Sequence, residues 1–188
     1  MAGVKAGVLA LQGDFREHAR VLERLGATPL LVRTPADLAA VGCLVIPGGE
    51  STTISRLARS RGLVEPIRDR AGAGMPVLGT CAGMIVMAAE VAGGIPLLEL
   101  MDIRVARNAY GRQTESFETD LEVDQVGPVR GVFIRAPVVE RVGPAVTVLG
   151  EVGGTPVVVE QGSLLAAAFH PELVGDGSLH RRMLERAG

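Results

Sequence analysis

Residues 71–89 constrain the fold most, because no charged side chain occurs over these nineteen consecutive positions. A run of this length could cross a bilayer as a helix. Four glycines and one proline interrupt it, however, so a buried strand over residues 77–79, a sharp turn and an apolar helix over residues 82–91 describe it better. We therefore predict that the stretch lies in the core of a globular domain and that the chain does not enter a membrane.

Strands and helices alternate with short links in the N-terminal half, a pattern typical of a parallel sheet covered by helices on both faces. Strands are expected over residues 4–11, 29–32, 43–46 and 77–79, and helices over residues 15–25, 36–40, from 51 onward and 63–70. Asp14 is expected to cap the first of these helices.

Short links containing Gly or Pro join the apolar runs of the C-terminal half, which favours antiparallel pairing there. Strands are expected over residues 103–105, 129–134, 146–149, 156–159 and 164–169, and a closing helix over residues 178–186. The predicted fold class is α/β with three layers: a mostly parallel sheet, flanked by helices, with antiparallel additions in the C-terminal half. A length of 188 residues suits one domain, residues 1–188.

Composition excludes several classes of function. The net charge is −2, so there is no excess of basic residues to bind a phosphate backbone. One Tyr and four Phe are the aromatic residues, too few for a surface on which bases stack. No nucleic acid is therefore expected as a partner. Cys43 and Cys81 are too few for a disulfide scaffold and form no Cys/His cluster, so no metal site is expected. The N-terminus lacks the pattern of a secretory signal, which indicates a cytoplasmic protein.

The turn Gly79-Thr80-Cys81-Ala82-Gly83 is the strongest candidate for a reactive site. It has the G-x-C-x-G form of a nucleophile elbow, in which a strained strand-to-helix turn exposes the nucleophile at the end of the sheet. The helix N-terminus beside Cys81 favours the thiolate, which is the reactive species. Cys43 lies inside a predicted strand without a polar neighbour, and we interpret it as a core residue.

A thiol nucleophile requires a base, and His170 is the best candidate among the three histidines. It closes an apolar strand, and in extended chain Glu172, two residues on, points the same way and can orient the imidazole. His18 is expected to be a packed or surface residue, and His180 to lie on a solvated helix face.

The turn 47–51, Pro-Gly-Gly-Glu-Ser, also follows a strand and opens a helix. Backbone N–H groups of Gly49 and Ala82 are candidates for an oxyanion hole, because glycine allows close approach to a substrate. The turn is neither a P-loop nor a G-x-G-x-x-G motif, so we expect no nucleotide and no cofactor.

The strand-end Gly-Gly, the cysteine elbow and the C-terminal His-Pro-Glu, in this order, resemble class I (triad) glutamine amidotransferase domains, whose fold is flavodoxin-like. A finer resemblance is to the glutaminase subunits of pyridoxal 5′-phosphate synthase. The residues that carry it are the runs 47–53, 79–84, 107–113 and 131–137, of which Arg-Asn-Ala-Tyr-Gly-Arg-Gln at 107–113 discriminates most.

The resemblance implies a role for each matching position. Cys81 would attack the carboxamide of L-glutamine, His170 would transfer protons, and Glu172 would orient His170. The implied substrate contacts are Gly48, Gly49, Glu50, Arg107, Ile134 and Arg135. An Arg suits the α-carboxylate because its planar fork can bind it bidentately, but the sequence does not decide which Arg does so.

The family also implies a partner, a separate (β/α)₈-barrel lyase subunit that receives the ammonia, and a glutaminase that is poorly active until it docks. A reorientation of the Gly48-Gly49 turn on docking is a physical explanation for such activation. Two alternatives stay open: the glutaminase subunit of another amidotransferase, such as imidazole glycerol phosphate synthase, and an elbow-cysteine protein of the DJ-1/PfpI kind. A non-enzymatic subunit that kept the fold is a third, disfavoured by the intact Cys81, His170 and Glu172.

Overall fold

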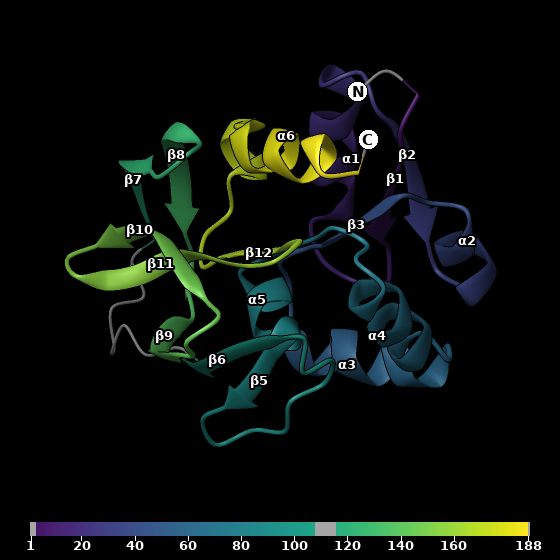
Figure 1. Ribbon diagram of the computed structural model, residues 1–188, viewed down its shortest axis with the longest axis horizontal. Coiled ribbons are helices and arrows are strands. Elements are labelled where there is room, and N and C mark those ends of the chain that lie inside the picture. The colour runs from purple at the N-terminus through teal and green to yellow at the C-terminus, as the bar shows by residue number, and fades with distance from the viewer. Residues whose placement is uncertain (1–2, 108–115, 188) are drawn as a thin grey trace.

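A seven-stranded sheet forms the centre of the protein in a computed structural model that describes residues 3–107 and 116–187 (Figure 1). The strand order is β10-β11-β12-β4-β3-β1-β2. The bounds are β1 Lys5–Leu9, β2 Thr28–Val32, β3 Cys43–Ile46, β4 Val77–Thr80, β10 Thr147–Val152, β11 Thr155–Gln161 and β12 Leu164–Ala167. The strands from β12 to β2 run parallel, whereas β10 and β11 add to the edge in antiparallel fashion. The mixed sheet predicted from the sequence is confirmed.

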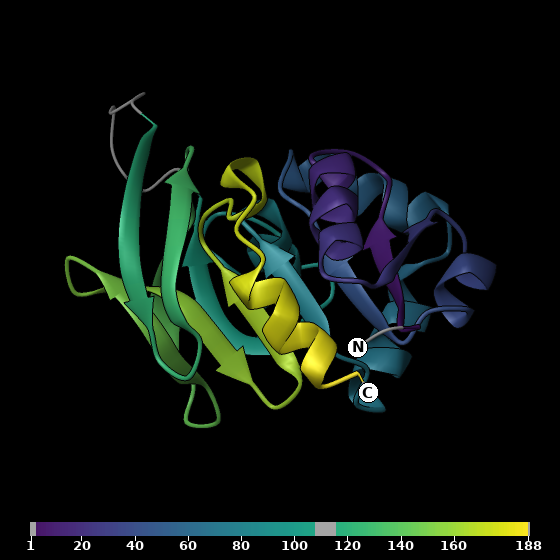
Figure 2. The same ribbon diagram turned by 90° about the horizontal axis from the view of Figure 1, so that it is seen from above.

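Helices cover both faces of this sheet and complete the three layers of the predicted fold class. Figures 1 and 2 show α1 and α6 together on one face, and Figure 1 shows α3, α4 and α5 on the other, with α2 beside β2. The helices are α1 Phe15–Arg24, α2 Pro35–Ala39, α3 Ser51–Ser60, α4 Val64–Gly72, α5 Ala82–Met87 and α6 Ser178–Glu185. The 3₁₀-turn η1, Glu172–Val174, lies between β12 and α6.

Two smaller sheets lie beside the C-terminal half of the large one. One has the order β5-β6-β9 and the other pairs β7 with β8. Their strands are β5 Ala88–Val91, β6 Met101–Ala106, β7 Phe117–Val123, β8 Gly127–Phe133 and β9 Val138–Val142. The sequence predicted β6 and β8 but missed β5, β7 and β9.

The helix expected over residues 82–91 is shorter than predicted, because α5 ends at Met87 and the chain continues as β5. The reason is a competition for backbone carbonyls. Val86 O accepts a hydrogen bond from Leu98 N–H at 3.0 Å and Met87 O accepts one from Leu100 N–H at 2.9 Å. Carbonyls that would continue the helix are thus bound by the chain that leads into β6.

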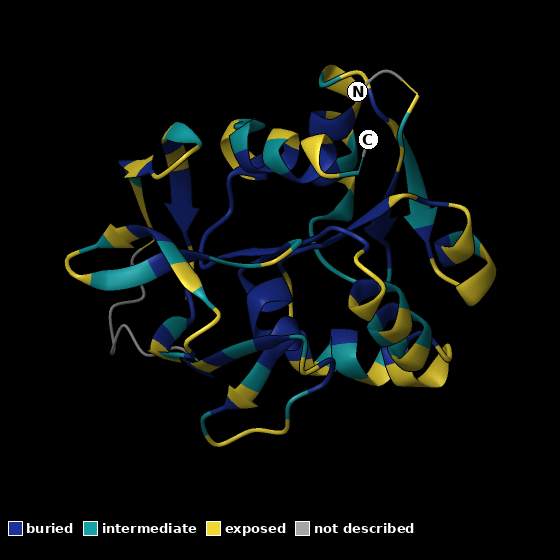
Figure 3. Ribbon diagram, in the orientation of Figure 1, coloured by how far each residue is buried: buried dark blue, intermediate teal, exposed yellow. Residues whose placement is uncertain are grey.

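Residues 75–88 of the uncharged stretch lie in the interior, as predicted, whereas residues 72–74, at the end of α4, are exposed. Every residue of β4 and α5 is buried, and Figure 3 shows α5 in the colour of buried residues throughout. Among the described residues, no helix is long and apolar enough to cross a membrane.

Two glycines allow α5 to pack directly against the sheet. A Cβ on Gly83 would lie 2.1 Å from the carbonyl oxygen of Ile46, and a Cβ on Gly79 would lie 2.8 Å from the carbonyl carbon of Gly83. Both neighbours are backbone atoms, which cannot move without distorting β3 or α5. The tight turn around Cys81 therefore depends on the absence of side chains at these two positions.

We expect Gly83→Ala to lower the free energy of unfolding by roughly 1–3 kcal/mol, the cost of overpacking a well-packed core. Gly72→Ala is the matched control, because no atom lies within 4 Å of its Cβ position and its residue ends α4. This control should leave stability unchanged or raise it by up to about 1 kcal/mol. Urea denaturation of both variants measures the difference, and equal stabilities would contradict the packing argument.

Candidate active site

Cys81 lies at the turn between β4 and α5 with φ at 48° and ψ at −105°. Positive φ is unusual for a residue with a Cβ and stores backbone strain. The turn is held from the opposite side, because Cys81 N–H donates to Ala167 O on the neighbouring strand β12 at 2.8 Å. The geometry is that of a nucleophile elbow, with the Cys81 side chain at the carboxyl end of the parallel strands.

Cys81 opens into a cavity of about 470 Å³ at this end of the sheet. Most of the residues that the sequence analysis proposed for substrate and catalysis line it: Gly49, Glu50, Cys81, Ala82, Arg107, Ile134, Arg135 and His170. Gly48 and Glu172 do not line this cavity, since both pack against His170 instead. Gln12, Asp14, Ser51, Ile85 and Leu173 also line the cavity and were not singled out from the sequence as cavity residues.

His170 and Glu172 form a short hydrogen bond, 2.8 Å between His170 Nδ1 and Glu172 Oε1. The contact is the one predicted, but the backbone reason for it was wrong. Residues 170–172 are not extended: Pro171 has φ −70° and ψ −28°, and Glu172 begins η1. This turn of the backbone brings the carboxylate of Glu172 back towards the imidazole of His170.

Strand β8 fixes the backbone of His170. His170 N–H donates to Val132 O at 2.8 Å, and Val132 N–H donates to His170 O at 3.4 Å. A Cβ on Gly48 would lie 2.2 Å from His170 Cε1. The absence of a side chain at Gly48 therefore leaves the room that the imidazole of His170 occupies.

The electrostatics of the pair favour a charged His170. Burial alone would lower the pKa of His170, but hydrogen bonds to Cys81 and Glu172 outweigh it and raise the pKa to about 10. Burial would raise the pKa of Glu172, but His18 and His170 hold the pKa of this carboxyl well below its usual range. An imidazolium beside a thiol stabilises the thiolate, so the site is suited to nucleophilic attack.

Two residues near His170 and Glu172, His180 and Asp14, depart from the sequence expectations, whereas His18 agrees with them. His180 was expected on a solvated face but is fully buried, because it shares a face of α6 with the buried residues Met183 and Leu184. His18 is packed, as expected, and lies between His180 and Glu172. Asp14 is the residue before α1 but makes no capping hydrogen bond through its side chain, and its Oδ2 lies 3.4 Å from His170 Nδ1.

The turn 47–51 is held at both ends. Gly48 O accepts from Asp14 N–H at 3.2 Å, and Glu50 N–H donates to Gln12 Oε1 at 2.7 Å. The side chain of Glu50 accepts from the N–H groups of Thr52 and Thr53, which caps α3 and lowers the pKa of Glu50 to about 2. The carboxylate of Glu50 therefore lies at the cavity but is already hydrogen-bonded to the first turn of α3.

The two arginines of the cavity differ in their surroundings. Arg135 is exposed and has φ at 45°. Arg107 is half-buried and donates from Nη1 to Thr52 Oγ1 at 3.1 Å, while its Nε is buried without a hydrogen-bond partner in the described part of the chain. The remainder of the discriminating motif, residues 108–113, lies outside the described residues.

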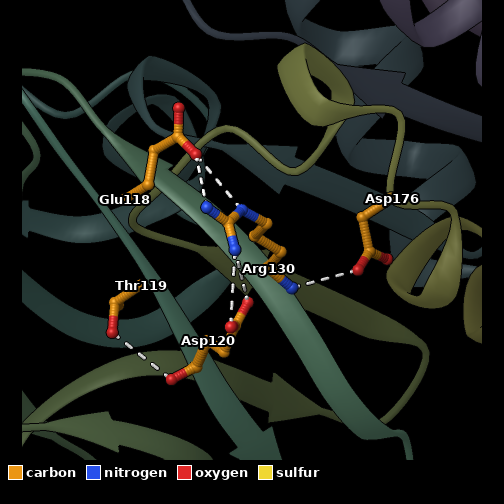
Figure 4. Close-up of polar contacts among 5 residues, drawn as sticks. All are labelled: Glu118, Thr119, Asp120, Arg130 and Asp176. Atoms are coloured by element: carbon orange, nitrogen blue, oxygen red, sulfur yellow. Dashed lines mark hydrogen bonds and ion pairs between the residues drawn. The ribbon is translucent and has the colours of Figure 1, made fainter.

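Arg130 connects the strands around the site with the segment that follows Glu172. Its guanidinium on β8 bridges Glu118 and Asp120 of β7, and its backbone N–H donates to Asp176 Oδ2 at 3.0 Å (Figure 4). Strand β8 thus holds the C-terminal segment on both sides of Glu172, at His170 and at Asp176.

Asp14, His170 and Glu172 present potential metal-ligating atoms within 4.8 Å of one another. The 2.8 Å contact between His170 Nδ1 and Glu172 Oε1 is a direct hydrogen bond, however, and leaves no room for an ion between these two atoms. The cluster is better explained as a buried base with its orienting carboxylate.

The sequence model of the SNO glutamine amidotransferase family matches residues 8–186. The chain belongs to this family. Glutamine amidotransferases are enzymes that release ammonia from glutamine, so the cavity around Cys81 is the candidate active site of a glutaminase. This confirms the resemblance found in the sequence and disfavours the DJ-1/PfpI alternative.

Named relatives agree with the family assignment. A protein named pyridoxal 5′-phosphate synthase subunit PdxT from Frankia casuarinae is 56% identical over 98% of this chain and 96% of its own length. A protein of the same name from Thermus thermophilus is 54% identical over the full length of both. A crystal structure of a glutamine amidotransferase superposes with a TM-score of 0.94 at 52% identity, covering 97% of this chain and 98% of that one.

We expect an NMR titration of the His170 ring to show a midpoint near pH 10, far above the ordinary 6.5. Cys81→Ala should lower this midpoint, because one of the two hydrogen-bond partners that favour the charged ring is lost. His180 is the internal control: burial lowers its pKa to about 3, so it should stay neutral between about pH 5 and 8.

The same shift has a defined effect on stability. Because the folded-state pKa of His170 is raised, its contribution is complete below pH 6.5 and is lost as the pH rises towards 10. A His170 midpoint near 6.5 would contradict the proposed coupling to Cys81 and Glu172.

Proposed function

We propose that this chain hydrolyses L-glutamine to L-glutamate and ammonia with Cys81 as nucleophile, His170 as base and Glu172 as the residue that orients His170. The observation that carries the proposal is the direct His170–Glu172 hydrogen bond beside a strained Cys81 in the same cavity. A strained nucleophile, a base and an orienting carboxylate are the three parts that acyl transfer to a side chain requires.

The reaction follows from these groups in two halves. In the first, the Cys81 thiolate attacks the carboxamide carbon, and the oxyanion is held by backbone N–H groups of Gly49 and Ala82. The imidazolium of His170 gives its proton to the departing nitrogen, so the C–N bond breaks, ammonia leaves and a glutamyl thioester remains. In the second half, neutral His170 takes a proton from water, the hydroxide attacks the thioester, and glutamate leaves as the Cys81 thiolate returns.

Arg107 is the better candidate for binding the α-carboxylate of glutamine. Its buried Nε lacks a partner among residues 3–107 and 116–187, and a buried N–H donor without a partner is rare in folded proteins. A carboxylate in the cavity would satisfy it and would use the fork geometry of the guanidinium. Arg135, which is exposed, is the second candidate, and the carbonyl of Ile134 lies 3.9 Å from Cys81 Sγ.

We further propose that the ammonia passes to a separate pyridoxal 5′-phosphate synthase subunit, a (β/α)₈-barrel lyase, as the names of the relatives and the resemblance of the sequence suggest. Residues 1–188 would act as one glutaminase domain in the cytoplasm, where two buried free thiols suit a reducing compartment. The hydrogen bonds at Gly48 O and Glu50 N–H would have to rearrange if docking reorients the turn to complete the oxyanion hole.

Glutamate release should rise when the lyase subunit is added to the chain, and Cys81→Ala should abolish it in both conditions. Cys43→Ala is the matched control, because Cys43 is the second buried cysteine and lies in β3 outside the cavity. This control should keep its activity. Glutamate release by Cys81→Ala would overturn the proposed nucleophile, and equal rates with and without the lyase would overturn the proposed activation.

Replacing Arg107 should affect binding more than chemistry. We expect Arg107→Gln to raise KM for glutamine at least tenfold with a smaller change in kcat, because the α-carboxylate is bound in the ground state and the transition state alike. Arg61→Gln, at the far end of α3 and outside the cavity, is the control. Steady-state kinetics with the lyase present give both constants, and an unchanged KM would transfer the role to Arg135.

A further inference from the structure

The reaction described above leaves a buried group of polar side chains unused. His18 on α1, His180 on α6 and Thr80 at the end of β4 have no solvent exposure, and all three lie directly behind the catalytic residues. Burying polar groups is unfavourable unless they are hydrogen-bonded, so a cluster of this kind requires an explanation.

His18 stands at the centre of this cluster. Its Nε2 lies 3.4 Å from Glu172 Oε1 and 3.1 Å from Thr80 Oγ1, and its Nδ1 lies 2.8 Å from His180 Nε2. Thr80 is the residue before the nucleophile, and Glu172 is the partner of the base. The imidazole of His18 therefore contacts both Thr80, which precedes the nucleophile, and the carboxylate of Glu172.

The contacts constrain where the protons of the two histidines lie. A carboxylate only accepts hydrogen bonds, so Nε2 of His18 must carry a proton, which lies between two acceptors, Thr80 Oγ1 at 3.1 Å and Glu172 Oε1 at 3.4 Å. If Nδ1 of His18 then accepts from His180 Nε2–H, the remaining nitrogen of His180 has a lone pair and no proton. That nitrogen, Nδ1, is the buried atom of His180 without a partner in the described residues, and burial keeps His180 neutral by lowering its pKa to about 3.

We propose that His18, supported by His180, is a positioning residue of the glutaminase. It holds the carboxylate of Glu172 at a fixed position relative to both His170 and the turn that carries Cys81. The inference rests on the function proposed above. It adds His18 on α1 and His180 on α6 to the hydrogen-bonded group formed by the three catalytic residues.

Glu172 needs such a second donor because the first one changes during the reaction. His170 alternates between imidazolium and neutral imidazole, whereas Glu172 Oε2 has no partner within the part of the chain that the structure describes. Without His18, the carboxylate would depend on His170 alone at every step. With His18, Oε1 keeps a donor whose own position is fixed by Thr80 and His180.

Two substitutions of similar polarity separate this role from simple packing. The amide nitrogen of Gln reaches the place of a His Nε2, so His18→Gln can still donate to Glu172 and Thr80. The shorter Asn reaches only the place of Nδ1, so His18→Asn keeps a polar group near His180 but loses the donor to Glu172. The pair is matched, because each variant keeps the contacts of one ring nitrogen and removes those of the other.

We expect His18→Asn to lower kcat of the chain with its lyase partner about 10- to 100-fold, by analogy with the loss seen when a hydrogen-bond partner of a metal-ligating side chain is removed. KM for glutamine should change little, because His18 does not line the cavity. His18→Gln should restore most of kcat. Urea denaturation of both variants shows that the loss occurs in folded protein.

Three outcomes would overturn the proposal: full kcat in His18→Asn, equal losses in the Asn and Gln variants, or a change in KM alone. If His18→Asn does not fold, the pair His180→Asn and His180→Gln tests the proposal instead. Gln keeps a polar group at the place of Nε2 beside His18, whereas Asn does not. Equal kcat values for these two variants would also overturn the proposal. Cys81→Ala measured alongside keeps the two proposals apart, because glutamate release by that variant refutes the catalytic assignment, whereas its inactivity beside a fully active His18→Asn refutes only the role of His18.

Discussion

The hydrogen bond between His170 and Glu172 places a carboxylate with no solvent exposure inside the protein, and much of the surrounding structure serves to make that arrangement stable. A buried carboxylate left without partners would cost several kcal/mol. Donors come from His170 and His18, which lie on segments far apart in the sequence. The C-terminal segment must therefore be fixed to β8, and α1 and α6 must lie side by side on the same face of the sheet (Figure 2).

The nucleophile is positioned by a different mechanism, the register of two parallel strands. Strand β12 pairs with β4 so that Ala167 lies opposite Thr80, and the next residue, Cys81, binds the carbonyl of Ala167. His170 follows three residues later on the same chain. The nucleophile and its base thus come together at neighbouring strand ends, while Gly79 and Gly83 allow α5 to press against β3 and hold the strained turn.

Local sequence patterns predicted the elements that make up the large sheet, because their strands are short apolar runs and their turns contain Gly or Pro. The strands that were missed lack this signal. Strand β7, with the sequence Phe-Glu-Thr-Asp-Leu-Glu-Val, is not an apolar run, because exposed charged residues occupy every second position. This alternation is itself typical of a strand with one buried face, and it was not used in the sequence analysis. Strand β5 continues an apolar helix, and its start depends on hydrogen bonds from Leu98 and Leu100 that no local pattern reveals.

The amino-acid sequence alone indicates the chemistry: a cysteine between two glycines at a strand end, a histidine two residues before a glutamate, and a family resemblance that the comparison confirmed. The residues that support this chemistry become visible only once the chain is folded. His18 and His180 are 162 positions apart, and nothing local indicates that their rings meet behind Glu172. The reason is physical: turns and strands follow from neighbouring residues, whereas a buried hydrogen-bond network forms only when distant elements pack and exclude water.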